Sequence, residues 1–176
     1  MLRSIFTYGA LAGAILLPFE LAVAFAVPGS DGMAIGYLVM LAAFSMVFLG
    51  IKRRRDIVGG GVIGFWPALG FGLAISIVAS IFYVISWEIS MAFSGTDFIG
   101  AYADAVIAQT RAKGAGAAEI ARVTASMNEM RASYANPLFR LPITFSEIAP
   151  VGLLVSLVSA GLLRNPRVLP VRARKA

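Results

Sequence analysis

Four long runs of apolar residues set the pattern along the chain. They extend from Ser4 to Val27, from Met33 to Ile51, from about Gly64 to Met91 and from about Thr144 to Leu163. A helix rises about 1.5 Å per residue, so about 20 residues cross the roughly 30 Å hydrocarbon core of a bilayer. The pattern therefore predicts four membrane-spanning helices.

Two tryptophans lie near the ends of the third run. Trp66 and Trp87 would be about 31 Å apart along a helix, close to the thickness of the hydrocarbon core. We expect both side chains to anchor this span at the two membrane interfaces, where tryptophan is enriched.

The segment between the third and fourth runs has the mixed polarity of soluble helices. Its apolar residues recur at helical spacing on both sides of the breaker Gly114-Ala115-Gly116: Phe98, Tyr102 and Ala105, then Ile120, Val123, Met127, Met130 and Tyr134. We predict a helical hairpin over about residues 97–135, ended by Asn136-Pro137 because the residue before a proline disfavours helical geometry. Its apolar stripes are expected to pack on each other or on the membrane surface, or to bind a protein partner.

The composition points to a membrane protein and removes several kinds of chemistry. Of the 176 residues, 59% are hydrophobic and 14% are charged, whereas soluble domains carry about 25% charged residues. The chain contains no cysteine and no histidine, which excludes disulfides, thiolate nucleophiles, imidazole bases and zinc sites built from these residues. We predict an all-α fold in one domain, a four-helix transmembrane bundle with an extracytoplasmic hairpin, and we expect no metal or cofactor.

The Lys and Arg residues predict the orientation of the spans. Ten of the fifteen flank span ends on one side: Arg3, Lys52, Arg53, Arg54, Arg55, Arg164, Arg167, Arg172, Arg174 and Lys175. The turn from Pro28 to Gly32 has none, and segment 95–143 nearly balances five basic residues with four acidic ones. Basic residues favour the cytoplasmic side, so both termini and the basic tail 164–176 are expected in the cytoplasm. This placement explains the net charge of +6 better than nucleic-acid binding does.

The first run has an alternative interpretation as a signal peptide. It begins with a basic residue and an apolar stretch, and Ala24-Phe25-Ala26 resembles a cleavage site with small residues. Pro18 and Glu20 interrupt the apolar stretch, and the run is long for a signal. We therefore favour a spanning helix.

Small residues recur at intervals of four within three of the predicted spans. They are Gly9 and Gly13, then Gly72, Ser76 and Ser80, then Gly152, Ser156 and Ala160. Because small residues let helices approach closely in lipid, these faces are expected to contact other helices. Packing within one bundle is favoured over homodimerisation, and the oligomeric state stays open.

Three acidic residues in the spans are the strongest candidates for chemistry. Glu20, Glu88 and Glu147 are all expected in the outer half of the bundle, with Glu20 the deepest. A charged carboxylate in lipid is costly, so Glu20 should face the bundle, pair or bind a proton. The three could form one site that binds a cation or proton or pairs with Arg140. Alternatively they act separately, in an interhelical hydrogen bond, as a wetted interface residue and as a charge at a helix N-terminus.

A basic run follows the second span. Lys52, Arg53, Arg54 and Arg55 precede Asp56 and Gly59-Gly60-Gly61, so they are expected to contact anionic lipid headgroups on the inner surface. A phosphate-binding loop is not expected, because no strand precedes the glycines and no Gly-Lys-Ser or Gly-Lys-Thr follows.

Several of these segments resemble one bacterial family. They are 50–56 (GIKRRRD), 60–65 (GGVIGF), 72–84 (GLAISIVASIFYV) with Trp87-Glu88, 134–142 (YANPLFRLP) and 147–152 (EIAPVG). Together they are similar to bacterial membrane proteins known as domain of unknown function 4199. The resemblance implies four spans in the bacterial inner membrane and implies no activity.

Two classes of function stay open at this point. The first is a non-catalytic membrane component that binds lipid, or a protein partner through the hairpin. The second is a small transporter or ion-coupled subunit that uses Glu20, Glu88 and Glu147. We favour the first, because four spans leave little room for alternating access and no inverted repeat is visible.

Overall fold

The computed structural model describes residues 1–25, 30–94 and 97–170. These residues form six α-helices and no strand: α1 (Leu2–Phe25), α2 (Ser30–Ile57), α3 (Phe65–Ser94), α4 (Phe98–Ala112), α5 (Ala117–Tyr134) and α6 (Pro137–Leu163). Four of them, α1, α2, α3 and α6, are long and apolar enough to span a membrane. The predicted all-α fold with four apolar helices is thus confirmed.

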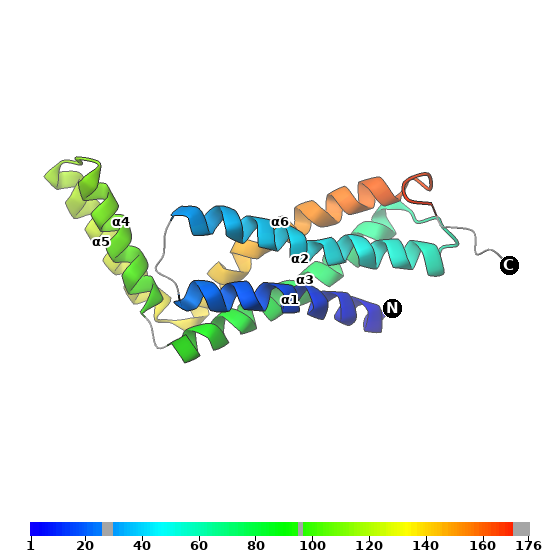
Figure 1. Ribbon diagram of the computed structural model, residues 1–176, viewed down its shortest axis with the longest axis horizontal. Helices are drawn as coiled ribbons and strands as arrows, with labels where there is room; N and C mark the ends of the chain where they lie inside the picture. The colour runs from blue at the N-terminus through cyan, green and yellow to red at the C-terminus, as the bar shows by residue number, and fades with distance from the viewer. Residues whose placement is uncertain (26–29, 95–96, 171–176) are drawn as a thin grey trace.

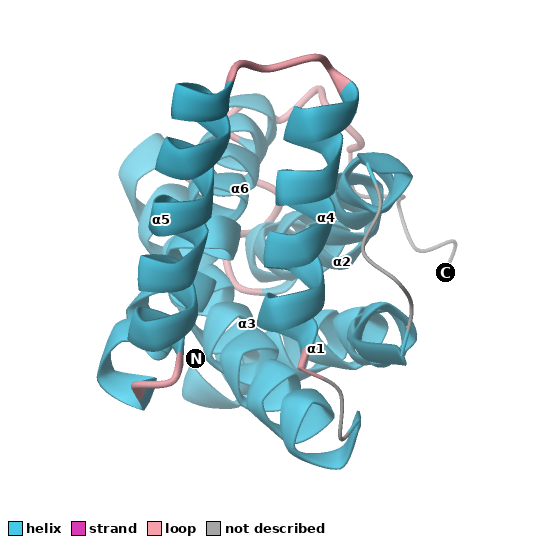
Figure 2. Ribbon diagram, turned by 90° about the vertical axis from the view of Figure 1, so that its left-hand side faces the viewer, coloured by secondary structure: helices cyan, strands magenta, loops and turns pink. Residues whose placement is uncertain are grey.

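The four apolar helices form an elongated bundle, with the hairpin of α4 and α5 at one end (Figure 1). We call this the hairpin end, where α1 and α3 finish and α2 and α6 begin. The opposite end, which carries the basic run, is called the basic end. Helix α1 begins and helix α6 finishes there. Viewed from the hairpin end, α4 and α5 lie side by side in front of the bundle (Figure 2).

Polar groups fix the shape of the hairpin. The Asp97 carboxylate caps α4 by accepting a hydrogen bond from the Gly100 backbone N–H at 2.8 Å. The Arg131 guanidinium of α5 donates to the Asp104 carboxylate at 2.6 Å and to the Gly100 carbonyl at 2.8 Å. Helix α5 has no fully buried residue, so apolar packing between the two helices is modest. The polar bonds therefore contribute substantially to holding α4 and α5 together.

Several helix boundaries differ from the sequence-based expectation. Helix α2 begins at Ser30, inside the expected outer turn, and α3 ends at Ser94 instead of about Met91. Two differences are larger. Helix α2 continues through the basic run to Ile57, and α6 begins at Pro137 instead of about Thr144. The Asn136 side chain caps α6 by accepting from the Leu138 N–H at 3.0 Å, and Pro137 fits the first turn because its missing N–H is not needed there. Glu147 therefore lies ten residues inside the helix, and its expected role as a charge at the helix N-terminus was wrong.

Part of the expected outer turn and the last basic residues of the tail lie outside the described residues. So does Ala26 of the candidate cleavage site.

Apolar side chains fill the interior of the bundle and also cover its outside. The buried core includes Leu16, Phe44, Val47, Ile51, Ile75 and Ile148. Exposed leucines and isoleucines cover the flanks of the same helices, for example Leu38, Ile81 and Leu154. A surface this apolar is stable only against lipid, which agrees with the spanning helices.

The small residues of the spans lie at helix contacts within this chain. A Cβ atom added at Gly9 would come within 2.5 Å of Val78, and one at Gly13 within 2.6 Å of Phe82, so α1 and α3 pack too closely for a side chain. Similar contacts surround Gly72 and Gly152, and Ser80 and Ala160 are buried. The Ser76 hydroxyl is 3.2 Å from the Gly152 carbonyl and 3.0 Å from the Ser156 hydroxyl. These bonds join α3 to α6 across the lipid-spanning region.

Candidate functional site

In the basic run of residues 52–55, two side chains form ion pairs within the protein and two have no acidic partner among the described residues. Arg55 is completely buried, and its guanidinium donates to the carbonyls of Val168 at 2.8 Å and Leu169 at 2.7 Å. Arg55 and Lys52 also bind the Asp56 carboxylate, at 2.8 Å and 2.5 Å. Arg55 therefore attaches the segment after α6 to the end of α2, whereas Lys52 pairs with Asp56 within α2 itself.

Arg53 and Arg54 have no acidic partner among the described residues. Arg53 is exposed and Arg54 is half-buried. The Arg54 guanidinium carbon lies 4.8 Å from the centre of the Phe71 ring, where a cation is attracted to the aromatic face. Two positive charges at the basic end thus have no acidic partner among the described residues, and Phe71 holds one of them, Arg54, in place.

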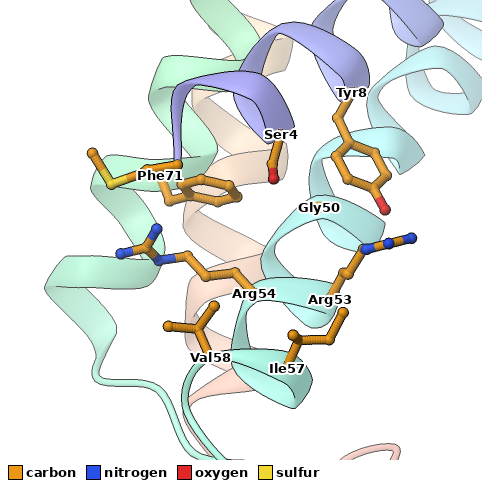
Figure 3. A pocket seen from close by; sticks show the side chains of 9 residues that line it. Ser4, Tyr8, Gly50, Arg53, Arg54, Ile57, Val58 and Phe71 are labelled. Carbon is orange, nitrogen blue, oxygen red and sulfur yellow. The ribbon is translucent and has the colours of Figure 1, made fainter.

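A pocket lies between these two arginines, at the junction of α1, α2 and α3 (Figure 3). Its polar lining is Ser4, Tyr8, Arg53 and Arg54, and its apolar lining is Met1, Gly50, Ile57, Val58 and Phe71. Figure 3 shows the Tyr8 hydroxyl directed towards the side of the pocket that Arg53 occupies, with Arg54 reaching towards Phe71. Hydroxyl and guanidinium donors beside an apolar wall suit an anion that is attached to a hydrocarbon chain.

The hairpin end has a different polar centre, formed by Arg140 of α6 and Glu88 of α3. The Arg140 Nε atom donates to one Glu88 carboxylate oxygen at 2.6 Å, and its terminal nitrogen donates to the other oxygen. Arg140 also donates to the Tyr134 carbonyl at 3.2 Å. This two-point ion pair joins α3 to α6 and to the end of α5.

Trp87 lies beneath the hairpin instead of at a lipid interface. Its side chain is 7% exposed, donates from the indole N–H to the Tyr134 hydroxyl at 3.0 Å and packs edge-on against Phe98. Burial raises the pKa of the Tyr134 phenol, so the phenol stays neutral and accepts this bond. The expected interface role of Trp87 was wrong, because an amphipathic indole fits a buried polar partner equally well. Trp66, at the other end of α3, is 76% exposed.

Glu20 and Ser90 are the two residues of the described spans whose buried side-chain oxygen atoms have no hydrogen-bond partner in the described chain, and Glu20 is the ionisable one. Its side chain is 2% exposed, and neither carboxylate oxygen has a hydrogen-bond partner in the described chain. The Ser86 hydroxyl of α3 is the polar group next to it, without forming a bond of ordinary geometry. Glu20 lies five residues before the last residue of α1, and so in the half of the bundle nearer the hairpin.

The three glutamates lie in the same half of the bundle but in two surroundings. Glu88 is paired with Arg140. Glu20 and Glu147 both act electrostatically on the buried Tyr83 hydroxyl, which lies five residues before Glu88 on α3. Glu147 is exposed on the flank of α6, whereas Glu20 faces the interior.

The sequence did not reveal the aromatic members of either site. Tyr8, Phe71 and Tyr83 stand inside long apolar runs, and the periodicity of a lipid-spanning helix does not separate inward from outward positions. The sequence did contain one signal for the two tyrosines. A tyrosine within an apolar run carries a hydroxyl group that needs a hydrogen-bond partner, which indicates an inward-facing position.

A model of the family described as "Protein of unknown function (DUF4199)" matches residues 7–165 of the chain. The searches of curated proteins and of solved structures found no match.

Proposed function

The chain belongs to the DUF4199 family, whose description names no function, and from its own geometry we propose a non-catalytic membrane component that binds anionic phospholipid. In this proposal the protein lies in the bacterial inner membrane with both termini in the cytoplasm. Support for the orientation comes from the basic end, which gathers unbalanced Lys and Arg residues, whereas charges in the hairpin nearly cancel.

The pocket between Arg53 and Arg54 carries the lipid-binding proposal. Both guanidinium groups are unpaired in the described chain, and the pocket opens beside apolar side chains at the end of the spans. A phosphate headgroup would find the hydroxyls of Ser4 and Tyr8 there, with the guanidinium groups of Arg53 and Arg54 on opposite sides of the pocket (Figure 3). Its acyl chains would continue along the apolar flank of the bundle. This arrangement matches an anionic lipid better than a freely soluble anion, which has no use for the apolar wall.

Binding of single lipids to purified, delipidated protein tests the proposal. We expect phosphatidylglycerol to bind more tightly than phosphatidylcholine with the same acyl chains, as measured by native mass spectrometry. Replacing Arg53 and Arg54 by Ala should remove about 2 kcal/mol, or a factor of about 30 in affinity, at about 1 kcal/mol per basic residue near a membrane surface.

A matched control replaces Arg164 and Arg167, which are exposed at the same end, by Ala. This variant loses the same charge outside the pocket and should keep most of the affinity. Equal losses in the two variants would show diffuse surface attraction and contradict a pocket. Competition by millimolar inorganic phosphate would instead indicate a site for free phosphate.

A further inference from the structure

The buried carboxyl group of Glu20 has surroundings that no other acidic group of the described spans has. Helices α1 and α3 run in the same direction, and their register is fixed by the close contacts of Gly9 with Val78 and of Gly13 with Phe82. Continuing this register places Glu20 against the stretch of α3 that contains Ser86. The carboxyl group is therefore fixed in position by tight packing, and it is not a mobile surface side chain.

Among the described residues, no Lys or Arg forms an ion pair with Glu20. The titratable groups around Tyr83 are the carboxyls of Glu20 and Glu147 and the phenols of Tyr37 and Tyr134, from α1, α6, α2 and α5. Arg140, the cation on α6 in this half of the bundle, is engaged by both oxygens of Glu88. An ionised Glu20 would have neither a counter-ion nor a hydrogen-bond donor of ordinary geometry, which makes the charged form strongly unfavourable in lipid.

The choice of ligand for this carboxyl group follows from the number of oxygen atoms available. A metal cation buried in a dry site must exchange its hydration shell for about six oxygen ligands of the protein. In the described residues, no group of three or more acidic side chains that could hold a metal ion is present, and one carboxyl with the hydroxyls of Ser86 and Ser90 supplies too few oxygen atoms to replace that shell. A proton needs a single oxygen atom and also removes the charge.

We propose that Glu20 is a proton-binding site, neutral in the state described here, whose proton exchanges with the aqueous phase at the hairpin end. The end of α1 is five residues away, or about 7 Å by helical rise. Glu20 and Glu147 both act electrostatically on the Tyr83 hydroxyl, so we place the exchange route past this hydroxyl and the Glu147 carboxyl. This site is separate from the lipid pocket at the basic end.

Infrared difference spectroscopy of the protein in lipid nanodiscs tests proton binding without a reagent that must enter the bundle. At neutral pH we expect the carbonyl band of a protonated carboxylic acid that disappears in Glu20→Gln and persists, shifted, in Glu20→Asp. The band should be unchanged when sodium chloride replaces choline chloride. If Glu20→Gln removes no such band, or if sodium abolishes it, the proposal is overturned.

The exchange route has its own measurement. After transfer to D₂O, the Glu20 band shifts as the proton is replaced by a deuteron, and the rate of this shift reports access. We expect the shift to be at least several-fold slower in Glu147→Gln and unchanged in Glu119→Gln, which removes an exposed carboxylate from the hairpin. Equal rates in the wild type and in Glu147→Gln would refute the route past Glu147.

Discussion

The ion pair between Arg140 and Glu88 should control whether the hairpin stays docked on the bundle. Arg140 holds both the Glu88 carboxylate on α3 and the Tyr134 carbonyl at the end of α5. Replacing Arg140 by Gln removes the charge and the terminal nitrogen atoms that bind Glu88 and Tyr134, while keeping the side chain polar and its stem as far as Cδ. We therefore expect the hairpin to separate more readily from the bundle in this variant.

The size of the effect follows from the exposure of the two partners. Their side chains are 18% and 28% exposed, so the pair is neither a fully solvated surface pair, worth up to about 1 kcal/mol, nor a fully buried one. Because the pair makes two charge-assisted hydrogen bonds and is partly buried, we expect a coupling free energy between Arg140 and Glu88 of about 1–2 kcal/mol. In a double-mutant cycle with Glu88→Gln, the double variant should therefore be less destabilised than the sum of the two single variants.

Trp87 provides the assay, because its indole is buried beneath the hairpin and bound to Tyr134. The chain has two tryptophans, and Trp66 is exposed at the basic end, so Trp66→Phe leaves Trp87 as the only indole signal. In this background we expect blue-shifted emission that resists quenching by acrylamide. Arg140→Gln should increase quenching at a denaturant concentration that leaves the helices intact by circular dichroism.

Two results would refute this reasoning. One is a coupling energy near zero, which would mean that the pair forms without stabilising the docked hairpin. The other is readily quenched Trp87 emission in the protein with Arg140 intact, which would mean that the indole is not covered by α5.

Three further predictions concern the packing and orientation of the bundle. Gly152→Val should lower stability by about 2 kcal/mol in thermal unfolding, because its contacts at 3.0 Å leave no room for a side chain, whereas Gly161→Val, with open space around it, should cost much less. Arg55→Met should destabilise by about 3 kcal/mol and speed trypsin cleavage after α6, because two backbone carbonyls lose a buried donor; unchanged cleavage would contradict the anchoring role. In a chain without cysteine, Ser126→Cys in the hairpin should react with an impermeant maleimide added to intact spheroplasts, and Asn165→Cys only after lysis; the reverse pattern would invert the topology.

The four spanning helices could be predicted from the sequence because lipid allows few alternatives. A backbone in hydrocarbon must satisfy its own hydrogen bonds, so a long apolar run becomes a helix whatever its neighbours are. Helix ends were less predictable. The apolar run suggested a start for α6 near Thr144, yet the cap at Asn136 sets its beginning at Pro137, and Pro142 and Pro150 lie within the helix.

The roles of individual charged residues depended on contacts between distant segments. Four adjacent basic residues look equivalent in the sequence, but successive positions on a helix point about 100° apart. Only the folded chain shows that Arg55 meets the carbonyls of Val168 and Leu169, whereas Arg53 and Arg54 stay unpaired in the part of the chain that is described. Whether the hairpin binds a protein partner stays a prediction.

The lipid pocket and the Glu20 site are far enough apart to act independently. Tyr8 lines the pocket and lies twelve residues before Glu20 on α1, which corresponds to about 18 Å by helical rise. The same spacing separates Phe71 from Tyr83 on α3. This separation exceeds the Debye length of about 8 Å at physiological salt, so Arg53 and Arg54 at the basic end cannot replace the missing counter-ion of Glu20.

This separation makes the two proposals distinguishable in the same set of variants. The Arg53 and Arg54 double variant should lose lipid affinity and keep the infrared band of Glu20. Glu20→Gln should lose the band and keep lipid affinity. If either variant changed both signals, the two ends of the bundle would be coupled through a rearrangement of α1 and α3, the two helices that contribute residues to both sites.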